Sequence, residues 1–178
     1  MARLATDRYV DISLGTVDAL AAGLGAPPGA VLLATHLKVT SVMTGEDSVL
    51  VTIQRDGELF GREAVVADGS WRDLIRIAAR TEDQAAPGTA PWVVLDLDNA
   101  VLRCRADPAE AERLAGYHRA ALEMIAADAG AGHSARSLVS AKEWDLQINR
   151  MAGPERALPE ESVSELFERQ VRTRPDEV

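Results

Sequence analysis

The spacing of apolar residues in the first half of the chain predicts two helices followed by two strands. A short amphipathic helix is expected within residues 16–25, where it ends at glycines. A second helix is expected over residues 27–43, because prolines open it and apolar residues recur at helical spacing. Residues 48–54 alternate and are rich in β-branched side chains, which predicts a strand. Asp56-Gly57 predicts a hairpin turn into a second strand that reaches Val66.

The pattern continues with a helix, two strands and a longer helix. Residues 70–80 are expected to form a helix opened by a Ser-x-x-Asp capping box, followed by a loop over residues 81–91. Residues 92–98 and 101–105 are extended runs separated by an asparagine. Residues 107–128 are expected to form a well-capped helix with an apolar face, because Asp107, Pro108 and Glu110 occur at its start. The chain therefore mixes helices and strands, which indicates an α/β fold.

The composition changes after Gly130. Residues 131–161 contain scattered glycines and prolines, with one short helix expected within residues 141–150, and are interpreted as a linker. A final amphipathic helix is expected to begin at Ser162, which would form a capping box with Glu165. Its apolar side consists of Val163, Leu166, Phe167 and Val171. A helix of this length is marginal alone, so it is expected to pack on another surface.

Charge and composition limit the partners. The 178 residues include 28 Asp+Glu against 19 Lys+Arg, for a net charge of -9. This balance argues against binding to nucleic acid or to an anionic membrane, both of which require a positive face. The chain is 47% hydrophobic, which argues against disorder. The apolar runs are far shorter than a membrane span or a signal peptide requires, so a cytoplasmic location is expected.

The side chains that could carry chemistry form no recognisable constellation in the sequence. One cysteine, Cys104, and three scattered histidines predict neither a disulfide nor a zinc site, and no cofactor is expected. His36 is expected to be a structural residue at the edge of the core, and His118 a structural or surface residue. His133 is expected in a solvated loop. Cys104 is expected to point inward as a small apolar residue.

Two aspartates also need an interpretation. Asp96 and Asp98, with Asn99, could suggest an oxygen-rich cation site. On a strand, however, alternate residues share one side, and Leu95 and Leu97 would occupy the other. The pair is therefore interpreted as the polar face of a half-buried strand.

The end of the chain resembles the opening of adenylation domains in nonribosomal peptide synthetases, which commonly begin with Leu-Pro and a helix like HELFExQVxRTPDxxA. Here residues 157–178 read ALPEESVSELFERQVRTRPDEV. The matching positions are Leu158, Pro159, Glu165, Leu166, Phe167, Glu168, Gln170, Val171, Thr173, Pro175 and Asp176.

The preceding part is similar to the C-terminal half of a condensation domain from the same enzymes. The similarity covers APPGAVLLATHLKVTSVMTGEDSVLVTI (26–53), REAVVADGSWRDLIRIA (62–78) and the segment 93–128, in the family's order. It implies one α/β lobe of the chloramphenicol acetyltransferase type, with a small mixed sheet packed with helices and an extended C-terminal linker. The family's catalytic HHxxxDG motif does not occur in this sequence, and its length leaves no room for a second lobe.

The resemblance implies a three-part organisation: a truncated condensation-like lobe (1–130), an interdomain linker (131–161) and the start of an adenylation domain (162–178). The expected function is non-catalytic: a scaffold that packs against the following adenylation domain in antibiotic or other natural-product biosynthesis. The residues expected at that interface are Trp144, Leu146, Ile148, Leu158, Leu166 and Phe167. A homodimer through the face left by the missing lobe is a second expected partnership.

Two other functions stay open. The chain could be half of an acyltransferase that a partner chain completes, with His36 or His118 reaching a shared cleft. It could also be a docking module that recruits an upstream synthetase subunit.

Overall fold

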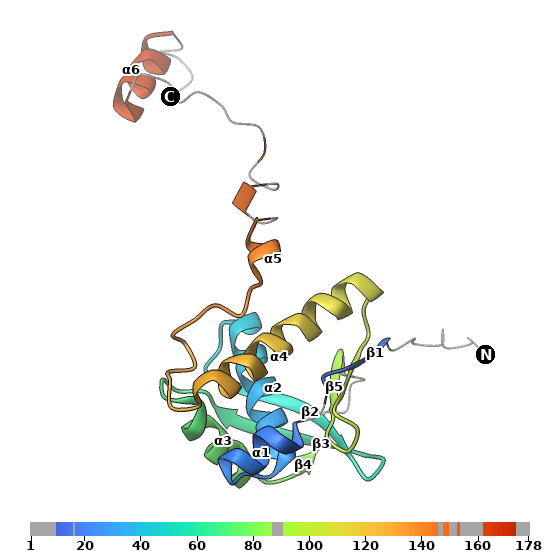
Figure 1. Cartoon of the computed structure of the whole chain (residues 1–178). Coiled ribbons are helices and arrows are strands. Elements are labelled where there is room, and N and C mark those ends of the chain that lie inside the picture. The colour runs from blue at the N-terminus through green and yellow to red at the C-terminus, as the bar shows by residue number, and fades with distance from the viewer. Residues whose placement is uncertain are drawn as a thin grey trace, which may run out of the picture. The chain divides into compact units, whose positions relative to one another are not determined.

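The computed structural model describes residues 10–15, 17–86, 91–145, 148–149, 153 and 162–173 (Figure 1). By its internal contacts the chain divides into two compact units, Met1–Ala141 and Lys142–Val178, and each is described by itself.

The first unit combines one mixed sheet with four helices among its described residues. Its elements in chain order are β1 (Val10–Ser13), α1 (Asp18–Leu24), α2 (Pro28–Thr44), β2 (Ser48–Arg55), β3 (Glu58–Val65), α3 (Trp71–Arg80), β4 (Gln84–Ala85), β5 (Val93–Asp96), β6 (Val101–Cys104) and α4 (Pro108–Asp128). The strands lie in the order β1-β6-β5-β2-β3-β4. Only β2 and β5 pair in parallel; the other described pairs are antiparallel. The expected α/β class, with a mixed sheet packed with helices, is confirmed.

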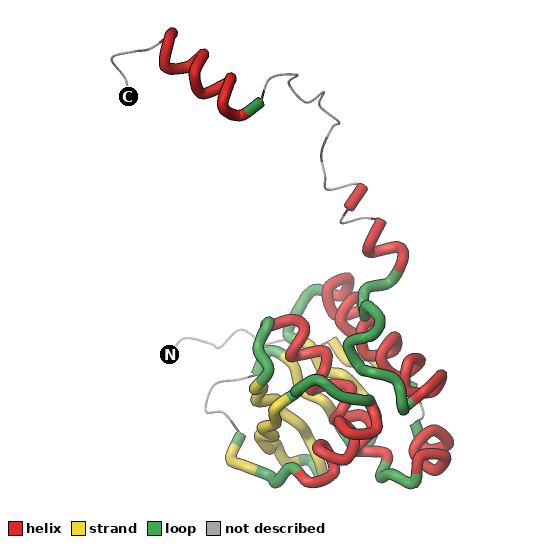
Figure 2. Tube along the Cα trace, turned by 90° about the vertical axis from the view of Figure 1, so that its left-hand side faces the viewer, coloured by secondary structure: helices red, strands yellow, loops and turns green. Residues whose placement is uncertain are grey.

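The helices lie to one side of the sheet, as Figure 2 shows. Alternation along β2 buries Val49, Val51 and Ile53, whereas Leu50 on the opposite face is 51% exposed. Helix α2 is at the centre of the helical layer, where it contacts α1, α3, α4 and β2. Eleven residues of α2 are buried, which suits a helix enclosed on several sides rather than along one stripe.

Local sequence signals explain where the helices begin and end. Helix α2 starts at Pro28 and stops before Gly45, whose φ of 74° is readily adopted by glycine. Helix α3 has the predicted capping box, in which Ser70 and Asp73 bond to each other's backbone amides. At the start of α4, the Asp107 carboxylate accepts two backbone N–H bonds at 2.9 Å. Each of these predicted boundaries is confirmed.

Two strands were not predicted from the sequence. Strand β1 is a four-residue edge strand that pairs with β6, for example Ile12 with Leu102. Strand β4 lies inside the expected loop 81–91, where Gln84 pairs with Gly61 on β3. Strand β4 has only two residues, too few to show an alternation, and β1 alternates over only Val10–Ser13. Both are edge strands, and their strand conformation depends on the ladder of the neighbouring strand.

The second unit contains α5 (Ala141–Asp145), which begins at the unit boundary, and α6 (Val163–Thr173). The predicted capping box of α6 is present: the Glu165 carboxylate accepts from the Ser162 amide at 2.7 Å, and the Glu165 amide donates to Ser162 Oγ at 3.3 Å. No residue of α6 is buried, and Phe167 is 63% exposed.

Among the described helices, none is by itself long and apolar enough to cross a membrane; α1 and α2 reach that length and hydropathy only as a pair bent by 97°.

Candidate functional site

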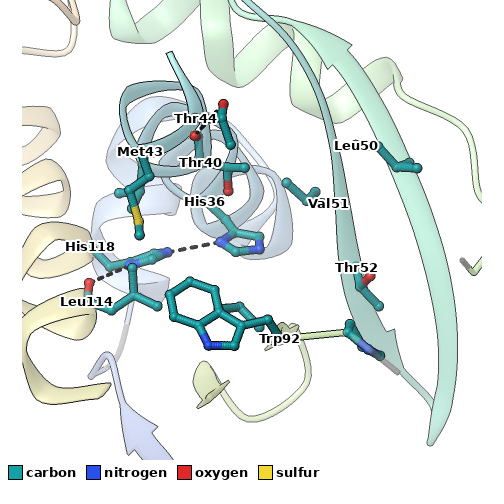
Figure 3. Close-up of a pocket in the computed structure, with 13 residues that line it drawn as sticks. His36, Thr40, Met43, Thr44, Leu50, Val51, Thr52, Trp92, Leu114 and His118 are labelled. Atoms are coloured by element: carbon teal, nitrogen blue, oxygen red, sulfur yellow. Dashed lines mark hydrogen bonds between the residues drawn. The ribbon is translucent and has the colours of Figure 1, made fainter. Parts of the chain in front are cut away.

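Two histidines that are far apart in the sequence meet between α2 and α4. Nδ1 of His36 lies 3.0 Å from Nε2 of His118, and the rings stack with centroids 5.3 Å apart and planes inclined by 29° (Figure 3). The packing of α4 on α2 brings them together, because each histidine is on the buried side of its helix. Both side chains are buried.

The hydrogen bonds determine where the protons are. Nδ1 of His118 lies 2.9 Å from the Leu114 carbonyl oxygen, which can only accept, so this nitrogen carries a proton. In neutral His118 the Nε2 atom is then the acceptor, and the bond to His36 requires that Nδ1 of His36 donates. Nε2 of His36 therefore keeps a free lone pair. The pair forms an ordered chain from the Leu114 carbonyl through His118 to His36.

Burial keeps both imidazoles neutral. It lowers the pKa of His118 to about 4, although the bond to the Leu114 carbonyl favours the protonated form. Burial, reinforced by the neighbouring His118, also lowers the pKa of His36 well below its ordinary value. At neutral pH, His36 thus offers a neutral nitrogen acceptor.

This acceptor lies at a pocket of about 470 Å³. The pocket forms where the parallel strands β2 and β5, paired at Ile53–Leu95 and Gln54–Asp96, separate towards their N-terminal ends. Its lining consists of His36, Val39, Thr40, Met43, Thr44, Leu50, Val51, Thr52, Pro91, Trp92, Val93, Leu114 and His118 (Figure 3). Val51 belongs to the helix side of the sheet, and Leu50 and Thr52 to the other side, so the pocket extends into the gap between the strands.

His36 lines this pocket, although the residue is only 4% exposed. The His118 bond involves Nδ1 of His36, and no hydrogen bond to Nε2 is found among the described residues. In Figure 3 the second ring nitrogen of His36 faces away from His118, towards the space between Thr52 and Trp92. The site therefore combines an oriented acceptor with mostly apolar walls.

Among the other candidate side chains, His133 is one that needs a correction. His133 is not solvated: it is buried, lies within hydrogen-bond distance (2.9 Å) of the Ala67 carbonyl and packs edge-on against Trp71 with ring centroids 5.9 Å apart. The loop that carries it is held to the start of α3, where the His133 amide donates to the Gly69 carbonyl. Cys104 is buried on β6, as predicted.

Asp98 lies in the turn after β5 rather than on the strand, whereas Asp96 ends the strand, as predicted. Asp96 is buried, and its carboxylate accepts from the backbone amides of Asp98 and Asn99 and from the Asn99 side chain. Arg103 lies 3.4 Å from the same carboxylate. Asp96 therefore stabilises the tight turn between β5 and β6, with its charge compensated by an arginine.

The predicted interface residues are not brought into one site by the described structure. Trp144 is 57% exposed, Ile148 51% and Phe167 63%, and Leu166 is half-buried. Leu146 and Leu158 lie outside the described residues. Their role at an interface stays a prediction.

The sequence contained some evidence that the two histidines of the pocket are buried. His36 is surrounded by apolar helix residues, and His118 follows Leu114 by one helical turn, which indicates burial of both rings. Nothing in the sequence indicated that the two would pair. No protein-family model matches this chain, and no curated protein matches it.

Proposed function

We propose that this chain is a condensation-like lobe of the chloramphenicol acetyltransferase type that supports a following adenylation domain of a nonribosomal peptide synthetase and performs no condensation by itself. The α/β class and the order of helices and strands fit the sequence resemblance. The sequence lacks the HHxxxDG motif, so the base that the family uses would not come from this lobe.

The observation that carries this proposal is the uncovered apolar side of α6. Val163 is 83% exposed and Phe167 63%, in a helix of eleven residues. Such a short helix gains little stability by itself, so its capping box and apolar stripe favour a partner surface. We propose that the adenylation domain supplies this surface, with the linker residues Trp144 and Ile148 adding to it.

Point variants in the parent synthetase test the proposed contact. If Phe167 is buried against the adenylation domain, Phe167→Ser should lower that domain's stability by about 2 kcal/mol. Ser164→Ala, an exposed change on the same helix, is the matched control. The measurements are thermal unfolding and amino-acid-dependent pyrophosphate exchange. Equal stability and activity of the two variants would count against the proposal.

Deletion tests the supporting role as a whole. Removal of residues 1–161 from the parent synthetase should reduce the solubility and melting temperature of the adenylation domain. An adenylation domain that keeps its full activity, solubility and melting temperature after this deletion would exclude a scaffolding role.

The helix-free face of the sheet supports the proposed homodimer. Leu50, Leu59 and Val65 are 51%, 44% and 55% exposed, and the β2–β3 register places them on this same face. We propose that a second copy covers it. Sedimentation should show a dimer that Leu59→Lys dissociates; only monomers at high protein concentration would contradict this partnership.

The histidine pair favours a second candidate function, an acyltransferase half-site completed by a partner chain. Nε2 of His36 could accept a proton from an attacking hydroxyl, thiol or amine only if the partner chain stabilised the imidazolium that burial disfavours. A partner bearing the HHxxxDG motif would then be required. If this function holds, mixing the two chains should generate acyl transfer that His36→Gln abolishes, whereas a scaffold would add no activity that depends on His36.

A further inference from the structure

The pocket at His36 has one well-defined polar feature. The chain of hydrogen bonds from Leu114 through His118 orients the imidazole of His36, so its Nε2 lone pair is presented in a fixed direction. A neutral imidazole nitrogen in this protonation state accepts a hydrogen bond and cannot donate one. A ligand group that meets it must therefore carry a proton, as a hydroxyl does.

The remaining walls select for an uncharged and largely apolar molecule. Val39, Met43, Leu50, Val93 and others supply hydrocarbon surface, and Trp92, which is 43% exposed, supplies an aromatic surface. The described lining includes no Asp, Glu, Lys or Arg; besides the two histidines, its polar side chains are Thr40, Thr44 and Thr52, and the Thr44 hydroxyl already donates to the Thr40 carbonyl. A charged ligand would lose its hydration in this pocket without gaining an ion pair.

The dimensions suit a small molecule. A volume of about 470 Å³ is within the range typical of ligand pockets. Two smaller hollows, of about 190 and 140 Å³, also have Met43 in their lining. Because methionine is unbranched and flexible, Met43 can adjust the boundary between these spaces to the shape of a ligand.

We propose that this pocket binds a small neutral molecule with an apolar body and a single hydroxyl group, of the phenol or alcohol class, and that the hydroxyl donates a hydrogen bond to Nε2 of His36. The apolar body would occupy the gap between β2 and β5, against Leu50 and Trp92. This site is independent of the scaffolding role and would exist in the free chain.

Two matched probes test the hydrogen bond without any mutation. Para-butylphenol can donate to His36, whereas para-butylanisole has the same apolar body and cannot. Titration of the whole chain at pH 7.5, followed by the NMR signals of the tryptophan indole N–H groups, should show the phenol binding about tenfold more tightly. The Trp92 signal should shift, and the signals of Trp71 and Trp144 should not. Equal affinity for the two probes, or binding of neither, would overturn the proposal.

A pair of variants tests the location. Leu50→Trp fills the pocket from β2 and should reduce phenol affinity at least tenfold. Leu59→Trp introduces the same side chain on the neighbouring strand β3, outside this lining, and should leave the affinity unchanged. Circular dichroism would establish that both variants are folded. Unchanged binding to folded Leu50→Trp would overturn the assignment of the site, and the result does not depend on any adenylation domain.

Discussion

Nδ1 of His36 and Nε2 of His118 lie 3.0 Å apart, although 82 residues separate them in the sequence. Among the residues that the structure describes, no carboxylate is hydrogen-bonded to either ring, and Nδ1 of His118 is bonded to the Leu114 carbonyl. A buried imidazole pair of this kind is stable only while it is neutral, because a proton added to either ring would lose hydration without an ionic partner. The first prediction follows from this requirement.

Acid should destabilise the fold through the histidine pair. The unfolded chain binds a proton on His118 near pH 6.5, but the folded chain does so only near its pKa of about 4. Stability is therefore complete above pH 6.5 and falls progressively between pH 6.5 and 4, by on the order of 3 kcal/mol for His118 alone. The lowered pKa of His36 acts in the same direction. Urea unfolding at a series of pH values would measure this loss.

The variant His118→Leu provides the control for the acid effect. It should have a shallower pH dependence than the natural chain, with a remainder from His36 and from His133, whose pKa burial also lowers. Parallel stability curves for the variant and the natural chain would show that His118 is not responsible.

Cys104 should be unreactive in the folded chain. Burial, followed by the nearby Asp11 and Glu110 carboxylates, raises the pKa of its thiol to about 11, so the thiolate is scarce at pH 8. We expect a disulfide reagent to modify Cys104 slowly in buffer and rapidly in denaturing urea. Complete modification within the mixing time in buffer would contradict this burial.

The Asp107 cap should contribute measurably to the stability of the first unit. Its carboxylate accepts from the Ala109 and Glu110 amides, so Asp107→Ala leaves both without this partner. The expected loss is about 1 kcal/mol in urea unfolding. Asp107→Asn keeps a side-chain oxygen at the same place and should cost less. An equal loss for the two variants would mean that the hydrogen bonds are not the cause.

The first unit should fold without the second. The described hydrophobic core is drawn from residues between Leu14 and Leu138, which all precede the unit boundary. A chain that ends at Ala141 should therefore melt within a few degrees of the whole chain, as followed by near-ultraviolet circular dichroism. A large drop in melting temperature would show that residues 142–178 are part of the cooperative unit.

The residues at element ends were sufficient to predict most of the fold. Helix starts at Pro28, Ser70 and Asp107 follow from proline geometry and side-chain caps, which involve groups only a few residues apart. The β2–β3 turn is of the same kind, because Asp56 and Gly57 adopt the positive φ angles that a tight hairpin requires. Helix caps and tight turns can be predicted from a sequence because the interacting groups are only a few residues apart along the chain.

The short strands could not be predicted in this way. The two residues of β4 show no period, and the single alternation of β1 was not enough to predict a strand; the extended conformation of both edge strands follows from pairing with β3 and β6. The same reason explains why the turn contacts of Asp96, at the end of β5, were not predicted. Its role depends on which backbone amides the turn directs at it.

The sequence by itself determined an α/β chain with capped helices, a buried Cys104 and a final amphipathic helix, because each depends on local spacing and on the side chains nearby. Only the tertiary structure decided that His36 and His118 share a hydrogen bond, that β2 and β5 run parallel and then separate, and that a pocket forms between them. Those features arise when elements distant in sequence pack together, and the free energy of that packing belongs to the whole core rather than to any one segment.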